Sequence, residues 1–269
     1  MIDFRPERIV CLTEESTETL YLLGEEDRIV GISGFTVRPE QARKEKPKVS
    51  LFTDASNDKI VDLKPDLVIG FSDIQADIAS QLIKKGINVW VSNQRSLKEI
   101  MAYIIQLGSW VGKQEEATEL VKNYQSRLDE IKTITQSWEN KPKVYFEEWY
   151  DPLISGISWV SELIEIAGGV DCFGHLAVES LAKNRIIAEH EEVIKANPDV
   201  IFASWCGKMF KKERLLAREG WEKIQAVKDD QIFEIDSSII LQPGPAALTD
   251  GVEEIFKYLK SWCDSNVSI

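Results

Sequence analysis

The sequence has few of the side chains that bind bare metal ions and none of the common enzyme motifs. Only two histidines, His175 and His190, occur in 269 residues, and neither follows a predicted strand. Zinc and manganese sites need several histidine and carboxylate ligands that converge on one point, so we expect no metal-ion site. A Walker loop, a GxGxxG fingerprint and a Gly-x-Ser-x-Gly nucleophile elbow are also missing, which disfavours the enzyme classes that use them.

Cysteine is scarce as well, and its spacing excludes a C-x-x-C motif. Four cysteines lie far apart in the chain, at Cys11, Cys172, Cys206 and Cys263, and we expect them to be ordinary reduced residues. The first residues lack the basic, apolar and small-residue blocks of a secretory signal. We therefore expect a cytoplasmic protein as the sequence is written, or an extracytoplasmic one if a leader has been removed and Met1 added.

Positive charge is in deficit. Lysine and arginine number 32 against 45 acids, which gives a formal net charge of −13. Nucleic acids and anionic membrane surfaces both need a basic footprint, so neither is an expected partner. No apolar run approaches the roughly 20 residues of a membrane span. The hydrophobic content of 43% and the alternation of predicted strands and helices are typical of an α/β protein.

One long helix is predicted from Gln114 to Ser137. Its apolar residues follow the three-and-four spacing of a single helical face. They are Ala117, Leu120, Val121, Tyr124, Leu128, Ile131 and Ile134. No glycine or proline interrupts the segment, and at about 1.5 Å per residue it would be roughly 35 Å long. This predicts a stiff strut that joins two domains.

The chain before this helix resembles the chain after it. Residues Asp58–Ile69 and Glu191–Phe202 align without a gap, 133 residues apart (199 − 66 and 191 − 58), around a shared Pro-Asp pair. Each half predicts an acidic short helix, a turn and a buried strand. We therefore predict two Rossmann-like α/β lobes with mainly parallel sheets, at residues 1–112 and 141–269, joined by a single long helix within 113–140. The alternative is one α/β domain with a surface helix.

Aromatic residues stand where predicted strands end. Three belong to the first lobe and three to the second, and two more candidates follow the last strand. They are Phe35, Phe52 and Phe71; Trp149, Tyr150 and Trp205; and Ile239 and Gln242. Parallel sheets bind ligands at the carboxyl ends of their strands, so these positions predict an apolar site for one large, flat ligand. The alternative is that the aromatic rings are buried core residues.

The sequence resembles a family in several motifs whose order and spacing run through nearly the whole chain. These are Thr17-Glu18, Gly31–Phe35 with Pro39, Asp58–Ile69, Ser155-Gly156, Ala167–Gly169, Glu191–Phe202, Ser204–Gly207 and Asp236–Pro245. Together they are similar to class III substrate-binding proteins of ABC importers, and in particular to the cobalamin (vitamin B12)-binding branch.

This resemblance implies a non-catalytic, monomeric protein that holds a corrinoid between its lobes against the aromatic positions above, with no further cofactor. It also implies that Asp58 and Glu191 dock onto arginines of an ABC transporter permease. From the residues alone, both acids could instead cap the helices that they begin. Ser238 stands where some relatives carry an acid, which leaves the polar recognition of the corrin side chains open.

Other functions remain as alternatives. A ferric siderophore would call for cationic residues, and the mapped positions hold none; haem would want an axial ligand, which Tyr150 could supply. A small-molecule enzyme could use Glu147 with Glu148 as an acid pair, or Cys206 as a thiol. We expect the acids to be solvated or paired and Cys206 to be an ordinary buried cysteine. A protein that stays in the cytoplasm could handle a corrinoid there.

Overall fold

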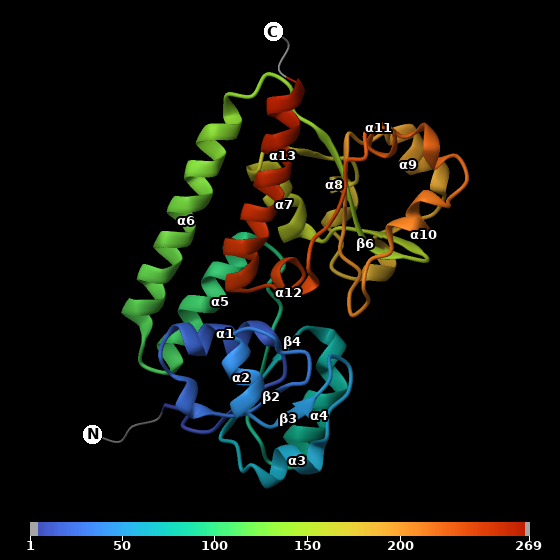
Figure 1. The fold of residues 1–269 in the computed structure, drawn as a ribbon. Coiled ribbons are helices and arrows are strands. Elements are labelled where there is room, and N and C mark those ends of the chain that lie inside the picture. Colours follow the sequence, from blue (N-terminus) through green and yellow to red (C-terminus); the bar gives the residue numbers. More distant parts are fainter. Residues whose placement is uncertain (1–4, 267–269) are drawn as a thin grey trace. The chain divides into compact units, whose positions relative to one another are not determined.

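The computed structural model describes residues 5–266, which form two compact units. Lobe 1 comprises Met1–Asn123 together with Gln242–Pro245, and lobe 2 comprises Tyr124–Leu241 together with Ala246–Ile269. The chain thus leaves lobe 2 near its end, contributes four residues to lobe 1, and returns. Figure 1 labels the elements of both units.

Lobe 1 is built on a five-stranded parallel sheet with the strand order β3-β2-β1-β4-β5. Its strands are β1 (Ile9–Cys11), β2 (Ile29–Ser33), β3 (Lys48–Ser50), β4 (Leu67–Phe71) and β5 (Val89–Ser92). Its helices are α1 (Glu14–Leu22), α2 (Glu40–Glu45), α3 (Asn57–Asp62), α4 (Ala76–Lys84) and α5 (Leu97–Trp110). The central strands β1 and β4 are buried along their whole length, as the continuous apolar runs predict.

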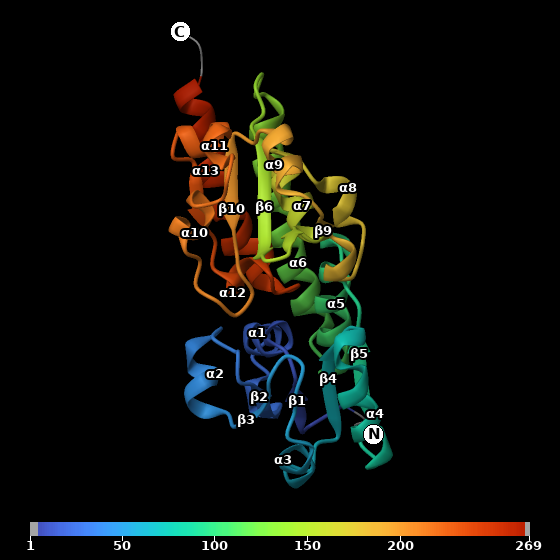
Figure 2. The same cartoon turned by 90° about the vertical axis from the view of Figure 1, so that its right-hand side faces the viewer.

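Lobe 2 has a six-stranded mixed sheet with the order β11-β10-β6-β7-β9, in which β8 also pairs with β6. Its strands are β6 (Lys143–Tyr150), β7 (Leu153–Ser155), β8 (Val170–Asp171), β9 (Ile186–Ile187), β10 (Val200–Ala203) and β11 (Ile232–Glu234). Strands β6, β8, β10 and β11 are parallel, whereas β7 runs antiparallel to both β6 and β9. Figure 2 shows β10 beside β6.

The helices of lobe 2 are shorter, apart from the last. They are α7 (Ser158–Ile166), α8 (Gly174–Ala177), α9 (His190–Ala196), α10 (Lys212–Leu216), α11 (Gln225–Lys228), α12 (Ser237–Ile240) and α13 (Val252–Asn266). A π-helical turn, Ala247–Gly251, leads into α13. The buried core on one side of the sheet is centred on Tyr145 and Trp221, whose rings meet edge to face.

Helix α6 (Gln114–Gln136) confirms the predicted long helix as one uninterrupted element of 23 residues (Figure 1). Five of its seven predicted apolar residues are buried: Ala117, Val121, Tyr124, Leu128 and Ile131. The prediction for Ile134 is wrong, because that side chain is 43% exposed. Thr135 is buried in its place, and its hydroxyl donates a hydrogen bond to the carbonyl of Ile166 at 2.9 Å.

The two Pro-Asp turns have the same role in each lobe. Asp66 precedes β4, and its carboxylate accepts the backbone N–H groups of Glu7 and Arg8 at 2.8 and 3.0 Å. Asp199 precedes β10, and its carboxylate accepts the N–H of Lys143 at 2.8 Å. In both lobes an aspartate therefore ties the start of one central strand to the start of its neighbour, which gives the repeated sequence a structural meaning.

Candidate functional site

The aromatic side chains at the strand ends of lobe 2 form one cluster. Strands β6 and β10 are parallel and in register, with Ala203 opposite Glu147, so their carboxyl ends emerge together. The Tyr150 ring lies 4.4 Å from that of Trp205 and 5.0 Å from that of Trp149, measured between centroids. Phe210, which the sequence did not single out, meets Trp205 edge to face at 5.0 Å. We call Trp149, Tyr150, Trp205 and Phe210 the lobe 2 aromatic cluster.

The members of this cluster differ in exposure. Trp205 is only 3% exposed, so most of its surface is covered by its neighbours, whereas Trp149 and Tyr150 are half-buried. Trp205 therefore acts mainly as the base on which Tyr150 packs. Trp149 and Tyr150 are the members that can offer ring surface to a ligand.

A buried carboxylate accepts a hydrogen bond from the lobe 2 aromatic cluster. Glu147 is fully buried within β6, and its carboxylate accepts the indole N–H of Trp205 at 2.9 Å. The same carboxylate accepts the Tyr145 hydroxyl at 3.1 Å and two guanidinium N–H groups of Arg218 at 2.6 and 3.0 Å. Four hydrogen bonds, two of them from a charged guanidinium, satisfy the buried acid and fix the direction of the Trp205 ring.

The neighbouring acid is neutralised in a different way. Glu148 accepts two N–H groups of Arg185 at 2.7 and 3.0 Å, and the Arg185 side chain is 3% exposed. Each member of the Glu147–Glu148 pair thus forms an ion pair with an arginine, which agrees with the expectation that these acids are solvated or paired. The Glu147 side chain is fully buried, and that of Glu148 is 16% exposed.

Two cations lie against the exposed part of the cluster. The Lys208 ammonium donates a hydrogen bond to the Tyr150 hydroxyl at 3.0 Å and lies 4.8 Å from the Trp149 ring centroid. The Arg214 guanidinium lies 5.0 Å from the Tyr150 ring centroid. The hydrogen bond from Lys208, followed by the one from Arg214, holds the pKa of Tyr150 below its usual value.

The predicted positions themselves hold no cation, as the sequence shows, but cations from other positions lie against their rings. Lys208 and Arg214 come from the segment that follows β10, beyond the strand-end positions from which the sequence argument was made. In lobe 1 the guanidinium of Arg95 likewise lies 4.6 Å from the Phe71 ring centroid. Aromatic rings with cations on them can bind ligands that combine an apolar body with anionic groups.

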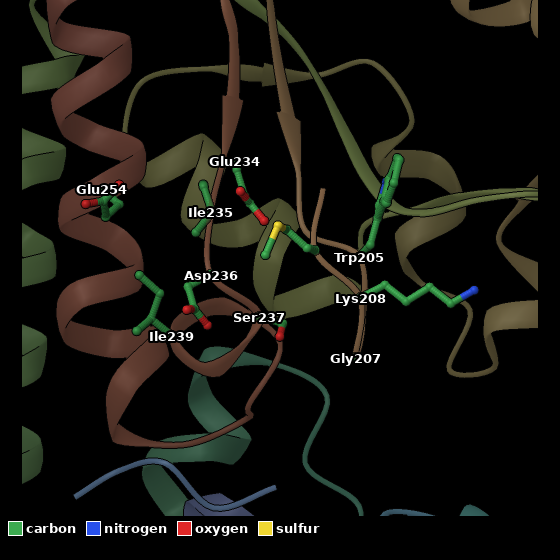
Figure 3. A pocket seen from close by; sticks show the side chains of 10 residues that line it. Trp205, Gly207, Lys208, Glu234, Ile235, Asp236, Ser237, Ile239 and Glu254 are labelled. Atoms are coloured by element: carbon green, nitrogen blue, oxygen red, sulfur yellow. The ribbon is translucent and has the colours of Figure 1, made fainter. Parts of the chain in front are cut away.

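A pocket of about 650 Å³ opens beside the lobe 2 aromatic cluster (Figure 3). Its apolar lining is Trp205, Met209, Ile235 and Ile239, and its polar lining is Gly207, Lys208, Glu234, Asp236, Ser237 and Glu254. Ile239, a predicted site residue, thus lines this pocket. The Glu234 and Asp236 carboxylates each accept a backbone N–H, from Phe210 at 3.0 Å and from Ser238 at 2.7 Å.

The predicted aromatic residues of lobe 1 also lie at strand ends. Phe35 follows β2 and is 45% exposed, Phe52 follows β3 and is half-buried, and Phe71 ends β4 and is 5% exposed. The exposed side chains of Leu51 and Ile74 add apolar surface next to them in the sequence. The carboxyl edge of this sheet therefore presents an apolar face, to which Phe35 and Phe52 contribute more surface than Phe71.

A buried glutamine joins two of these strand ends. The Gln75 side chain accepts the backbone N–H of Phe71 at 2.9 Å and donates to the carbonyl of Phe52 at 3.0 Å. A side chain added at Gly70 would approach this amide to 2.9 Å, so the glycine leaves room for it. Gln75 was not among the predicted site residues; it lies four residues after Phe71, the strand end to which it bonds.

Gln242, the remaining predicted site residue, belongs to the four-residue segment of lobe 1. Its amide donates to a carboxylate oxygen of Glu14 at 3.1 Å, and the carbonyl of Pro243 accepts the side-chain amide of Gln94 at 3.2 Å. Burial raises the pKa of Glu14 to about 7 and that of Glu15 to about 8. Gln242 thus contacts one buried acid of α1, Glu14, while Ile239 lines a pocket of lobe 2.

Comparison with known proteins places this architecture in a family. A family model described as "Periplasmic binding protein" matches residues 9–239. The chain belongs to that family. Its members are binding proteins rather than enzymes.

Individual relatives cover almost the whole of this periplasmic binding protein. It is 28% identical over 256 residues to an ABC transporter substrate-binding lipoprotein of Bacillus subtilis, covering 93% of this chain and 79% of the relative. It is also 28% identical over 267 residues to the vitamin B12-binding protein of Vibrio cholerae, covering 96% and 90%. The crystal structure of the Vibrio cholerae vitamin B12-binding protein BtuF aligns with a TM-score of 0.76 at 25% identity, covering 96% and 98%.

The two acids predicted to contact a transporter lie at equivalent, exposed places in this binding protein. Asp58 is in the first turn of α3, with a side chain that is 92% exposed and 3.1 Å from the Lys85 ammonium. Glu191 is exposed in the first turn of α9. The alternative that these acids cap their helices is wrong, because the N-cap positions are Ser56 and Glu189.

The remaining candidate, Cys206, is exposed in the loop after β10, so the expectation of a buried cysteine is wrong. Strand β10 ends at Ala203, and Cys206 is the third residue after it, where the chain has already left the sheet. Within residues 5–266 no group of three His, Cys, Asp or Glu side chains could hold a metal ion. None of the helices in that range has both the length and the apolar character to cross a bilayer.

Proposed function

We propose that this periplasmic binding protein captures a corrinoid, cobalamin or a precursor of it, for uptake by an ABC importer. The observation that carries the proposal is the pair of apolar, aromatic faces at the strand ends, with Trp149 and Tyr150 in lobe 2 and Phe35 and Phe52 in lobe 1. A corrin ring is a large, flat, largely apolar body that such faces suit. The similarity to vitamin B12-binding proteins over nearly the whole chain supports the same ligand.

Replacing Trp149 by alanine should weaken cobalamin binding by about 1–4 kcal/mol, because the change removes an accessible aromatic ring from the proposed contact surface. Titration of the purified chain with cobalamin, followed by visible absorbance and tryptophan quenching, measures the loss. Trp138→Ala is the matched control, since Trp138 packs on Phe256 and precedes β6 at the opposite edge of the sheet. Equal affinities of the Trp149 variant and the unaltered protein would remove this face from the site.

Haem is the second candidate, because Tyr150 has the properties of an axial ligand. Its hydroxyl bonds to Lys208, its pKa is lowered, and phenolate is the form that coordinates ferric haem iron. Tyr150→Phe keeps the ring and removes the oxygen. If haem is the ligand, this variant should lose the absorbance shift of bound haem, whereas corrinoid binding should change little. Solved haem-binding proteins share the fold at 19–22% identity and do not favour either ligand.

The proposed partner is an ABC transporter permease, contacted by Asp58 in lobe 1 and Glu191 in lobe 2. Their exposure, and their equivalent places in the two halves, suit a partner with a basic rim. Changing both to lysine should abolish ligand-stimulated ATP hydrolysis by the reconstituted transporter and leave corrinoid affinity unchanged. Glu119→Lys, at an exposed position of α6, is the control and should preserve both activities. Full stimulation by the double variant would rule out this docking mode.

An importer takes up ligands from outside the cytoplasm, so this proposal places the protein there. The substrate-binding lipoprotein of Bacillus subtilis is consistent with that location. Handling of a corrinoid inside the cell is the alternative, and fractionation of cells that produce the native protein distinguishes the two.

A further inference from the structure

The face of lobe 2 that carries the aromatic cluster has opposite charges on its two sides. On one side Lys208 and Arg214 contact Tyr150, at 3.0 Å from its hydroxyl and 5.0 Å from its ring centroid. On the other side Glu234, Asp236 and Glu254 line the pocket, at whose rim Lys208 also lies. Figure 3 shows the Lys208 side chain extending away from these acids. Trp205, Met209 and Ile239 supply apolar surface to the same pocket.

The two cations have charge to offer a ligand. Nearby arginines are already neutralised, Arg218 by Glu147 and Arg185 by Glu148, and Lys212 lies 2.5 Å from Asp230. Within the described part of the chain, neither Lys208 nor Arg214 has a carboxylate within 4.0 Å. The group that they contact is instead the Tyr150 side chain, through its hydroxyl and its ring. The positive charge on this side is therefore uncompensated by protein.

The acids on the other side have oxygens to spare. Glu234 and Asp236 each use one carboxylate oxygen for a backbone N–H, and the Glu254 carboxylate accepts no hydrogen bond from a side chain in the range 5–266. Ionised carboxylates only accept hydrogen bonds, so this side suits a ligand that presents N–H donors and repels one that presents carboxylates.

We infer that the ligand carries an anionic group on the Tyr150 side and N–H donors on the pocket side of one apolar body. This inference rests on the proposed corrinoid function and narrows the range of corrinoids that the protein binds. A corrin ring bears primary amides, which are N–H donors, and complete cobalamin adds a phosphodiester in the nucleotide that loops from the ring. Cobinamide keeps the amides but lacks this phosphodiester. The chain therefore binds complete cobalamin more tightly than cobinamide, because Lys208 and Arg214 attract the phosphodiester that only cobalamin carries.

The test is to titrate the full chain and Lys208→Met with cobalamin and with cobinamide on the same samples. A hydrogen bond to a charged group contributes enough that the unaltered chain should bind cobalamin at least about 10-fold more tightly than cobinamide. Lys208→Met should lower cobalamin affinity by about the same factor and change cobinamide affinity by less than about twofold. Because both ligands meet the same sample, any misfolded fraction cancels from the ratio.

Lys212→Met is the matched control on the same segment, since Lys212 is occupied by Asp230, and it should preserve the preference for cobalamin. Equal binding of the two corrinoids by the unaltered chain, or an equal loss of both in Lys208→Met, would overturn the inference while leaving corrinoid binding intact. Failure of both corrinoids to bind the unaltered chain would instead overturn the proposed function, and the inference with it.

Discussion

Replacing Arg218 by methionine should lower the free energy of unfolding of lobe 2 by about 3–5 kcal/mol, because it leaves Glu147 as an uncompensated buried charge. The Glu147 side chain is fully buried and that of Arg218 is 10% exposed, so water cannot readily replace the lost guanidinium. The two remaining donors, from Tyr145 and Trp205, are neutral. Urea denaturation followed by tryptophan fluorescence measures the change.

Two controls separate the buried charge from other effects of the substitution. Glu147→Gln in the same chain removes the charge but keeps a carbonyl for the Trp205 indole, so the double variant should recover most of the lost stability. Lys85→Met breaks the exposed pair with Asp58 and should cost less than about 1 kcal/mol. A cost below about 1 kcal/mol for Arg218→Met would contradict a charged, buried Glu147.

Raising the pH from 5 to 9 should destabilise lobe 1 through Glu15, by an amount on the order of 4 kcal/mol. The pKa of this carboxyl is raised to about 8, mainly by burial. A hydrogen bond from Thr13 lowers the pKa, and the charges of Glu14 and Glu18 raise it. The folded state therefore holds a proton that the unfolded chain releases near pH 4.5. Stability from this group is complete below that pH and is lost as the pH rises through 8.

The neighbouring charges do not reverse this direction. Glu14, with a pKa raised to about 7, contributes in the same sense, and the Glu18 carboxylate accepts a hydrogen bond from Arg38 at 2.9 Å. Glu15→Gln resembles the protonated acid, so urea unfolding of this variant at pH 5, 7 and 9 should show a flatter decline than the unaltered protein. Glu119→Gln, on the exposed face of α6, should leave the slope unchanged. If the free energy of unfolding falls with pH equally for Glu15→Gln and the unaltered protein, the folded state does not hold a proton on Glu15.

The sequence predicts those parts of the fold that depend on local patterns. Helical periodicity predicts α6 to within a residue, and the paired Pro-Asp turns predict two similar α/β lobes. The pattern is less accurate at the end of the helix. There Ile134 and Thr135 are both spaced to continue the buried face, and a hydrogen bond to Ile166 decides in favour of threonine.

Features that depend on distant partners could not be predicted in this way. The hydrogen bonds between Glu147 and Arg218 join residues 71 positions apart, and no local pattern marks an arginine as buried. The antiparallel strand β7 has only three residues, too few to show alternation. The cations at Tyr150 belong to a loop, where spacing along the sequence does not give direction in space. The candidate aromatic residues could be predicted because strand ends are local features of the sequence. The polar residues around them could not, because they come from distant segments and loops.

The central claim is that the aromatic faces of this binding protein hold a corrinoid. Equilibrium dialysis of the purified chain against cobalamin, with haem and a ferric siderophore dialysed in parallel, tests it most directly. If the aromatic faces hold a corrinoid, the protein compartment should retain one cobalamin per chain and neither competitor at the same free concentration. Retention of haem or siderophore with no excess of cobalamin would contradict it.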